Sequence, residues 1–356
     1  MVNRFPNNFL TGLGMTRPII QAPMIGYVTE QMVIAVSNAG GLGSLPATLL
    51  PPDAISESIA LLRKKTRGPI AVNFLAHAAV TPETDREVAW RAQLAPFFDE
   101  LGLEQETGYA SMTIPVFGEA QCAALERARP DVVSFHLGLP AEEEFVTRLK
   151  TAGMIILSSA TTVAEARWLE ERGCDGIIAQ GLEAGGHRGS FLSTNLAEQC
   201  GTMALVPQIV DAVSVPVVAA GGIADPRGVA AAITLGASAV QVGTAFLFCP
   251  EAQVPVPYRE ALRKARSTDT VVTKVYSGLP ARVIANRFTR TLHDAQENVV
   301  PFPLGMAAVV PLVGASLKAG SSEIAPFWAG QAVGLGQSMG AAELVEHLSA
   351  AALALH

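Results

Sequence analysis

Paired cysteines, an excess of basic residues and long apolar runs are all missing from this sequence of 356 residues. Its four cysteines are widely separated and include no Cys-x-x-Cys pair: Cys122, Cys174, Cys200 and Cys249. Such spacing neither frames a disulfide scaffold nor provides a zinc site. Apolar residues make up 49% of the chain, yet no uncharged apolar run approaches the roughly 20 residues that span a bilayer. We therefore expect a large core, no metal site and no membrane partner.

The charge balance also argues against a nucleic-acid partner. The chain carries 25 Lys+Arg against 32 Asp+Glu, a net charge of -7, whereas proteins that bind nucleic acid display a basic surface. Residues 1–10 lack the basic start, apolar stretch and cleavage site of a secretory signal. The expectation is a cytoplasmic protein with a small-molecule partner; composition leaves the oligomeric state open.

Short apolar runs alternate with helical segments from about residue 17 to residue 242. The runs lack strict alternation of polar and apolar residues, which is typical of a sheet covered on both faces, and intervening helices require parallel pairing. The expected strands lie near residues 17–24, 40–44, 70–75, 131–136, 154–159, 176–180, 215–220 and 239–242. A doubly wound open sheet is the alternative, but no Gly-x-Gly-x-x-Gly follows the first strand. The pattern predicts an α/β fold, a closed (β/α)8 TIM barrel.

The pattern changes after Pro250, where prolines interrupt short helical pieces. We therefore predict a barrel over residues 1–249, a smaller and mainly helical domain over the barrel mouth at 250–318, and a C-terminal segment, 319–356, that returns to the barrel. Residues 80–110 are expected to form a helical excursion that packs on the barrel.

Glycines follow the last two predicted strands. Barrel enzymes bind their ligands at the C-terminal strand ends, and phosphate commonly lies after strands seven and eight. Gly221-Gly222 and Gly243-Thr244 expose backbone amides that a phosphate can contact, and the Thr244 hydroxyl adds a donor. Either pair by itself is also explained as tight-turn glycines.

Three carboxamides are expected at the same mouth. Asn73, Gln180 and Gln241 lie on the third, sixth and eighth predicted strands. A carboxamide offers adjacent donors and acceptors, as a flat heterocycle such as a flavin ring requires. Each amide by itself is more simply interpreted as a satisfied core residue, but three at one mouth favour a flavin.

The segment Glu183-Ala-Gly-Gly-His-Arg-Gly189 is the most specific local feature. Glycines on both sides of His187 let its backbone and imidazole approach a ligand, and a histidine transfers protons near neutral pH. The simpler interpretation is a loop histidine bound to backbone or solvent. His136, at the end of the fourth predicted strand, is expected to shape substrate access.

With these residues in view, the chain resembles the nitronate monooxygenases, formerly called 2-nitropropane dioxygenases, over essentially its whole length. The resemblance rests on Gln21-Ala-Pro-Met24, Glu183 to Gly189, Ala220-Gly-Gly-Ile-Ala-Asp225 and Gln241-Val-Gly-Thr-Ala-Phe-Leu247. It implies an FMN-dependent enzyme without a metal that oxidises alkyl nitronates, such as propionate 3-nitronate, with dioxygen to a carbonyl compound and nitrite.

The resemblance also assigns roles to residues. It implies that His187 is the catalytic base and that the cofactor is held by Ala22, Pro23, Met24, Asn73, Gln180, Gly185, Gly221, Gly222, Gln241, Val242, Gly243 and Thr244. Arg188 or backbone amides would then hold the anionic nitronate. One departure concerns the fifth predicted strand, which ends in Ser158-Ser159 where many flavin barrels carry a basic residue near the flavin.

Two other functions remain open at the level of sequence. Related barrels with the same loops are flavin-dependent NAD(P)H reductases of a quinone or an enoyl thioester. A barrel that binds a phosphorylated metabolite without flavin fits the glycine pairs as well. Trp328 and Gln331 are interpreted as packing residues and left out of the site.

Overall fold

The computed structural model describes residues 7–81, 83–105 and 114–353. An eight-stranded parallel sheet forms its centre, with the order β1-β9-β8-β6-β5-β4-β3-β2. Its strands are β1 (Ile19–Gln21), β2 (Gly43–Pro46), β3 (Ile70–Leu75), β4 (Val132–His136), β5 (Ile155–Ala160), β6 (Gly176–Gln180), β8 (Val217–Ala220) and β9 (Ala239–Val242).

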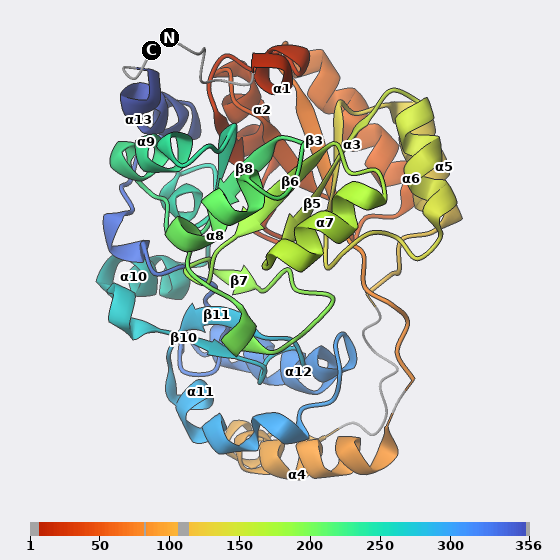
Figure 1. The fold of residues 1–356 in the computed structure, drawn as a ribbon. Helices are drawn as coiled ribbons and strands as arrows, with labels where there is room; N and C mark the ends of the chain where they lie inside the picture. The colour runs from red at the N-terminus through yellow and green to blue at the C-terminus, as the bar shows by residue number, and fades with distance from the viewer. Residues whose placement is uncertain (1–6, 82, 106–113, 354–356) are drawn as a thin grey trace.

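The sheet closes on itself between β1 and the chain just before β2. Leu42 forms a parallel bridge with Ile20, and its amide donates to the Ile19 carbonyl over 2.9 Å. The Gln21 amide in turn donates to the Leu42 carbonyl over 3.0 Å. Every strand therefore has two neighbours, and the predicted (β/α)8 barrel is confirmed (Figure 1).

Helices cover the outside of the barrel. They are α2 (Glu30–Asn38), α3 (Pro52–Lys65), α5 (Glu119–Ala128), α6 (Glu143–Thr151), α7 (Val163–Glu171), α8 (Thr202–Val210), α9 (Pro226–Thr234) and α13 (Ala341–Leu353), with the 3-10 turns η1 (Leu196–Glu198), η2 (Thr244–Phe248) and η5 (Val333–Leu335). The last helix, α13, packs against α9 and α2 and so completes the outer ring. Within the described residues, no helix combines the length and apolar character that crossing a membrane requires.

The N-terminal end of the barrel is closed by α1 (Asn7–Gly12) and the residues that follow it. Phe9, Leu10 and Met15 are buried against the interior side chains of the strands, among them Val132 and Val218. Because this end is filled with apolar side chains, the C-terminal strand ends are left as the place for a ligand.

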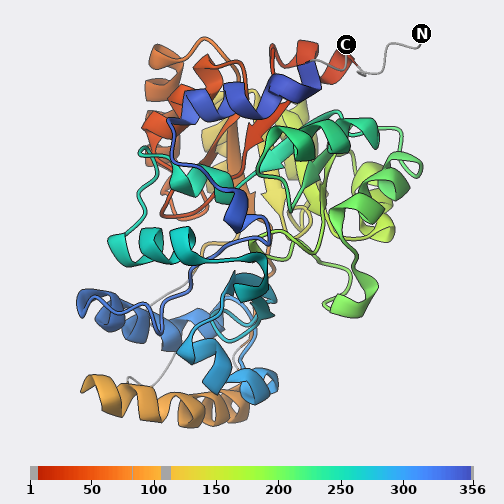
Figure 2. The ribbon, with the colours of Figure 1, turned by 90° about the vertical axis from the view of Figure 1, so that its left-hand side faces the viewer.

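A second unit lies beyond the C-terminal strand ends (Figures 1 and 2). It contains α11 (Arg287–Thr291), α12 (Leu304–Lys318), η3 (Ser267–Asp269), η4 (His293–Asn298) and the hairpin of β10 (Thr270–Thr273) and β11 (Ala281–Ile284). The preceding helix, α10 (Val256–Lys264), packs instead on the barrel side, where it contacts η2 and η5 and buries Tyr258 and Leu262 in the barrel's core. The hairpin was not expected from the sequence, although the β-branched run Thr270-Val-Val-Thr273 favours a strand. The short strand β7 (Gly186–His187), from the loop after β6, pairs with β11 and joins the two units.

The helix α4 (Thr84–Leu101) belongs to the second unit, not to the barrel as expected from residues 80–110. It packs on α12, and its buried Trp90 and Phe97 share a core with Phe288 and Leu312. Both views place α4 at the far side of the second unit from the barrel (Figures 1 and 2). The end of that prediction, 106–110, falls outside the described residues.

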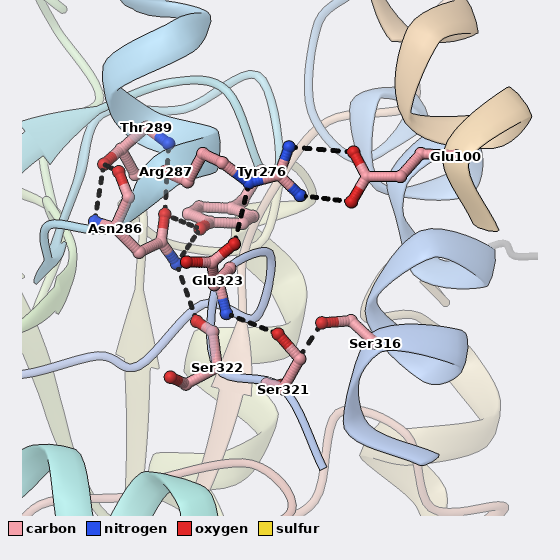
Figure 3. Close-up of polar contacts among 9 residues, drawn as sticks. All are labelled: Glu100, Tyr276, Asn286, Arg287, Thr289, Ser316, Ser321, Ser322 and Glu323. Atoms are coloured by element: carbon pink, nitrogen blue, oxygen red, sulfur yellow. Dashed lines mark hydrogen bonds and ion pairs between the residues drawn. The ribbon is translucent and has the colours of Figure 1, made fainter. Parts of the chain in front are cut away.

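Ion pairs fasten the end of α4 to the second unit. The Arg287 guanidinium donates to both carboxylate oxygens of Glu100, over 2.8 and 2.6 Å, and to Glu323 over 2.8 Å (Figure 3). Asn286 caps α11 by accepting from the Thr289 amide and donates to the Ala325 carbonyl. These contacts join segments that lie far apart in the sequence.

Candidate active site

A cavity of about 310 Å³ opens at the C-terminal ends of the barrel strands, beneath the second unit. Most of the residues predicted for the site line it: Ala22, Pro23, Met24, Asn73, His136, Gln180, Gly185, His187, Gly221, Gly222, Gln241, Gly243 and Thr244. Two predicted residues do not. The Val242 side chain is buried in the core between barrel and helices, and the Arg188 side chain is fully buried away from the cavity.

The loop after β8 requires glycine for steric reasons. Gly221 and Gly222 have φ values of +105° and +71°, a region that strongly favours glycine. A Cβ on Gly221 would lie 3.0 Å from the Ala184 nitrogen. Directly after this loop, Asp225 caps α9 by accepting from the Gly228 amide over 3.1 Å. At Gly221 and Gly222 the loop itself carries no side chain that would stand between its backbone amides and a ligand.

The turn after β9 is shaped differently. A Cβ on Gly243 would find its nearest neighbours at ordinary contact distance, 3.4 Å to Ala22 Cβ and 3.8 Å to Met24 Sδ. The protein alone therefore accommodates a side chain here, within the cavity wall. Thr244 Oγ1 accepts from the Gly330 amide over 3.0 Å, so its hydroxyl proton remains available for a ligand.

Two of the three predicted carboxamides have capacity left for a ligand. The Asn73 Nδ2 donates to the carbonyl and hydroxyl of Ser134, over 3.1 and 3.0 Å, which leaves its carbonyl oxygen. Gln241 is partly buried at the cavity, and no hydrogen bond of its side chain is found among the described residues. Since polar groups at a buried wall need partners, these amides are suited to a polar heterocycle.

Gln180 has a different role from the one predicted. Its Nε2 donates to the His187 carbonyl over 3.0 Å, and its Oε1 accepts from the Gly189 amide over 2.7 Å. Both ends of the carboxamide are therefore engaged with the segment that carries His187. Gln180 lines the cavity, but its polar atoms position this segment.

Arg188 corrects a second prediction, that it holds an anionic substrate. Its guanidinium donates to the carbonyls of Gln180 and Gly181, each over 2.7 Å, and to Gln199 Oε1 over 2.9 Å. Arg282 similarly donates to the Leu182 carbonyl. Both arginines hold the backbone after β6 in place, because buried carbonyl groups require donors; neither lines the cavity.

His187 lies against aromatic rings of the second unit. Its ring centroid is 5.6 Å from that of Phe302 and 5.1 Å from that of Trp328, and its Nε2 is 2.8 Å from Ser277 Oγ. Burial lowers the pKa of His187 from 6.5 to about 4, with a smaller contribution from His136. The imidazole is therefore neutral near pH 7 and able to accept a proton.

His136 supports the same segment from the barrel side. Its Nε2 lies 3.1 Å from the His187 carbonyl and its Nδ1 lies 3.0 Å from Ser159 Oγ. Because a carbonyl only accepts, Nε2 carries the proton and Nδ1 accepts from Ser159. Burial lowers the pKa of His136 to about 4, so this arrangement needs the neutral imidazole.

The lowered pKa of His136 leads to a prediction about acid stability. A histidine that is neutral when folded and has a pKa of 6.5 when unfolded loses stability as pH falls from about 6.5 to 4, because the unfolded chain binds the additional proton. From pH 7 to pH 5 this amounts to up to about 2 kcal/mol. The free energy of unfolding falls between pH 7 and pH 5, and we expect His136→Gln to make this decrease smaller by that amount. Urea unfolding at both pH values measures it. Parallel pH dependences of wild type and variant would contradict the assignment.

Several residues of the cavity were missed in the sequence. Phe302, Met306 and Trp328 line it, and the buried Ser277 contacts His187. Trp328 was interpreted as packing, yet its ring faces His187 (5.1 Å between ring centroids). A sequence signal existed only for the aromatics, which stand in proline-rich segments without helical periodicity. Nothing local marked Ser277 or Met306.

Comparison with known proteins gives a consistent family. A family described as nitronate monooxygenase matches residues 7–351. The nitronate monooxygenase of Pseudomonas aeruginosa is 40% identical over 347 residues, 96% of this chain and 98% of that protein. The nitronate monooxygenase of Paraburkholderia phytofirmans is 38% identical over 94% of this chain and 92% of its own length.

Solved structures agree with this result. A nitroalkane oxidase from Streptomyces ansochromogenes has a TM-score of 0.87 and 36% identity, covering 98% of this chain and 99% of its own. FabK from Thermotoga maritima has a TM-score of 0.72 and 31% identity over 97% and 94% of the two chains. Family match, identity and coverage point the same way: the chain belongs to the nitronate monooxygenase family, whose members are flavin-dependent oxidoreductases that oxidise nitronates.

Proposed function

We propose that this protein binds FMN and uses dioxygen to convert alkyl nitronates to a carbonyl compound and nitrite. The observation that carries the proposal is one cavity whose lining combines two kinds of group. Glycine loops suited to phosphate form one part of the lining, and a neutral histidine between aromatic rings forms another. The bound flavin would supply the electron-transfer chemistry, for which no side chain of the protein is a substitute.

The residues present fit a flavin mononucleotide. The amides of Gly221, Gly222 and Gly243 and the Thr244 hydroxyl would hold the phosphate, since bare backbone amides attract anions. Asn73 and Gln241 would meet polar atoms of the ring and the ribityl chain. Ala22, Pro23 and Met24 would form an apolar surface beside the ring. Among the described residues, no group of acidic, histidine or cysteine side chains is arranged to hold a metal ion.

His187 would act as the base when the substrate is a neutral nitroalkane. If its Nε2 proton is donated to Ser277 Oγ at 2.8 Å, Nδ1 is left unprotonated as the acceptor. Ser277 would then select the reactive tautomer. A nitronate has already lost this proton, so with that substrate His187 would only orient the nitro group.

An NAD(P)H-dependent reductase is the second candidate, because FabK shares this fold with 31% identity. Anaerobic mixing of the yellow holoenzyme with NADH or NADPH separates the two functions. We expect the flavin absorbance to persist after mixing with either nucleotide, on the timescale of turnover. In air, we expect ethyl nitronate to cause oxygen uptake and nitrite release. Rapid bleaching by either nucleotide without nitrite release would favour the reductase.

The cofactor itself is tested by purification. A colourless protein that takes up no FMN would contradict the proposal and leave the glycine loops for another phosphorylated ligand. The cytoplasmic location stays a prediction from the sequence.

A further inference from the structure

We infer that the site selects substrates whose carbon chain is apolar and uncharged, and that it discriminates against chains ending in a carboxylate. This inference rests on the proposed function and narrows its substrate class. Propionate 3-nitronate, the example that the resemblance suggested, is therefore expected to be a poor substrate.

The part of the cavity around His187 is apolar. Phe302 and Trp328 flank the imidazole with centroid distances of 5.6 and 5.1 Å, and Met306 and Ile114 complete this wall. Phe302 is itself fixed by an edge contact with His77, 5.3 Å between centroids. A substrate that places its nitro group at His187 meets these side chains with the rest of its chain.

No cation is available there to pair with a carboxylate. Within the described part of the chain, the residues lining the cavity include no lysine, arginine, aspartate or glutamate. The sequence of residues 106–113, next to Ile114, also contains no lysine or arginine. Among the described residues, the titratable side chains of the lining are Tyr27, His136, His187 and Tyr258.

The charged and titratable groups nearest to His187 are already engaged. Arg188 and Arg282 donate to the carbonyls of residues 180–182. The His136 Nε2 proton is donated to the His187 carbonyl, and the Tyr258 hydroxyl donates to the Trp328 carbonyl. A carboxylate in this wall would lose its water without gaining a positively charged partner, which is strongly unfavourable.

A matched pair of substrates tests the inference. The nitronate of 3-methyl-1-nitrobutane carries an isopropyl group where propionate 3-nitronate has its carboxylate, so the two have similar shape. We expect kcat/KM of the holoenzyme to be at least ~30-fold higher for the isopropyl compound, because an unpaired buried charge is costly. Equal values, or a preference for the carboxylate, would overturn the inference.

Variants of Met306 supply a second test with a matched control. Met306 is partly buried at the cavity, so a lysine there can reach the wall and keep partial contact with water. We expect Met306→Lys to shift the ratio of kcat/KM for the two nitronates at least ~10-fold toward propionate 3-nitronate. Met306→Gln, similar in size but uncharged, should leave this ratio near the wild-type value. An equal shift in both variants would contradict a role of charge. If Met306→Lys does not retain FMN, the inference is decided by the ratio of kcat/KM that the wild-type holoenzyme shows for the two nitronates.

A binding measurement tests this inference independently of the proposed reaction. Anaerobic titration of the holoenzyme with 3-methyl-1-nitrobutane or 3-nitropropionate, followed by the flavin absorbance, measures recognition without turnover. If neither nitronate is oxidised, the proposed function fails, and tighter binding of the isopropyl compound still supports the inference. Tighter binding of 3-nitropropionate would overturn it.

Discussion

His187→Asn is expected to lower kcat/KM for neutral nitroethane by about 10² to 10⁴-fold, the usual contribution of a positioned general base. Asparagine retains some hydrogen-bonding capacity but accepts no proton. Oxidation of ethyl nitronate, which needs no deprotonation, should fall far less. Flavin content should be unchanged, because the His187 imidazole is not among the groups that we assign to the phosphate or the ring of FMN. Nitrite release from both substrates, measured at equal flavin concentration, checks the result.

His293→Asn serves as the control for this experiment. His293 lies on η4 in the second unit and is not among the residues that line the cavity. The same chemical change there should leave both activities at the wild-type level. If His187→Asn keeps its nitroethane activity, His187 is not the base, and the neutral state that burial gives it would need another explanation.

Gly243→Val is expected to weaken FMN binding by at least ~100-fold, about 3 kcal/mol. The position has ordinary contact space for a Cβ and no positive φ, so the protein itself should still fold. The added side chain would project toward Ala22 and Met24, into the part of the cavity that we assign to FMN. Fluorescence titration of the apoprotein with FMN measures the affinity, and the urea midpoint reports whether folding is retained.

Gly314→Val supplies the matched control for the glycine variant. Gly314 is exposed on α12, and a Cβ there meets nothing within 4 Å. The same substitution should leave FMN affinity unchanged and should not lower stability, because valine has a higher helix propensity than glycine. Wild-type affinity in the folded Gly243→Val variant would remove Gly243 from the FMN site.

The residues of the site were recognisable in the sequence more often than their roles. Gly221, Gly222 and Thr244 could be assigned because they follow strands, and parallel strands bring their C-terminal ends to one mouth. Gln180 was identified on the same basis. Its hydrogen bonds to the segment 187–189 depend on how β7 pairs with β11, almost 100 residues later in the chain, and no local pattern contains that information.

Arg188 illustrates a related limit. An arginine next to a glycine-flanked histidine suggests an anion site, since charge and proximity along the chain are all that a sequence shows. In the structure the guanidinium turns to the carbonyls of Gln180 and Gly181, because those buried acceptors have to be satisfied before a ligand arrives.

By itself, the sequence determined the barrel, the order of its strands and the positions of its glycine loops, because apolar periodicity and turn residues act over short distances along the chain. Only the tertiary structure decided that α4 joins the second unit and that Phe302, Met306 and Trp328 form the wall around His187. An apolar helix face such as that of Trp90 and Phe97 can pack on any matching surface. Which surface it buries depends on the whole chain, because apolar burial is non-directional.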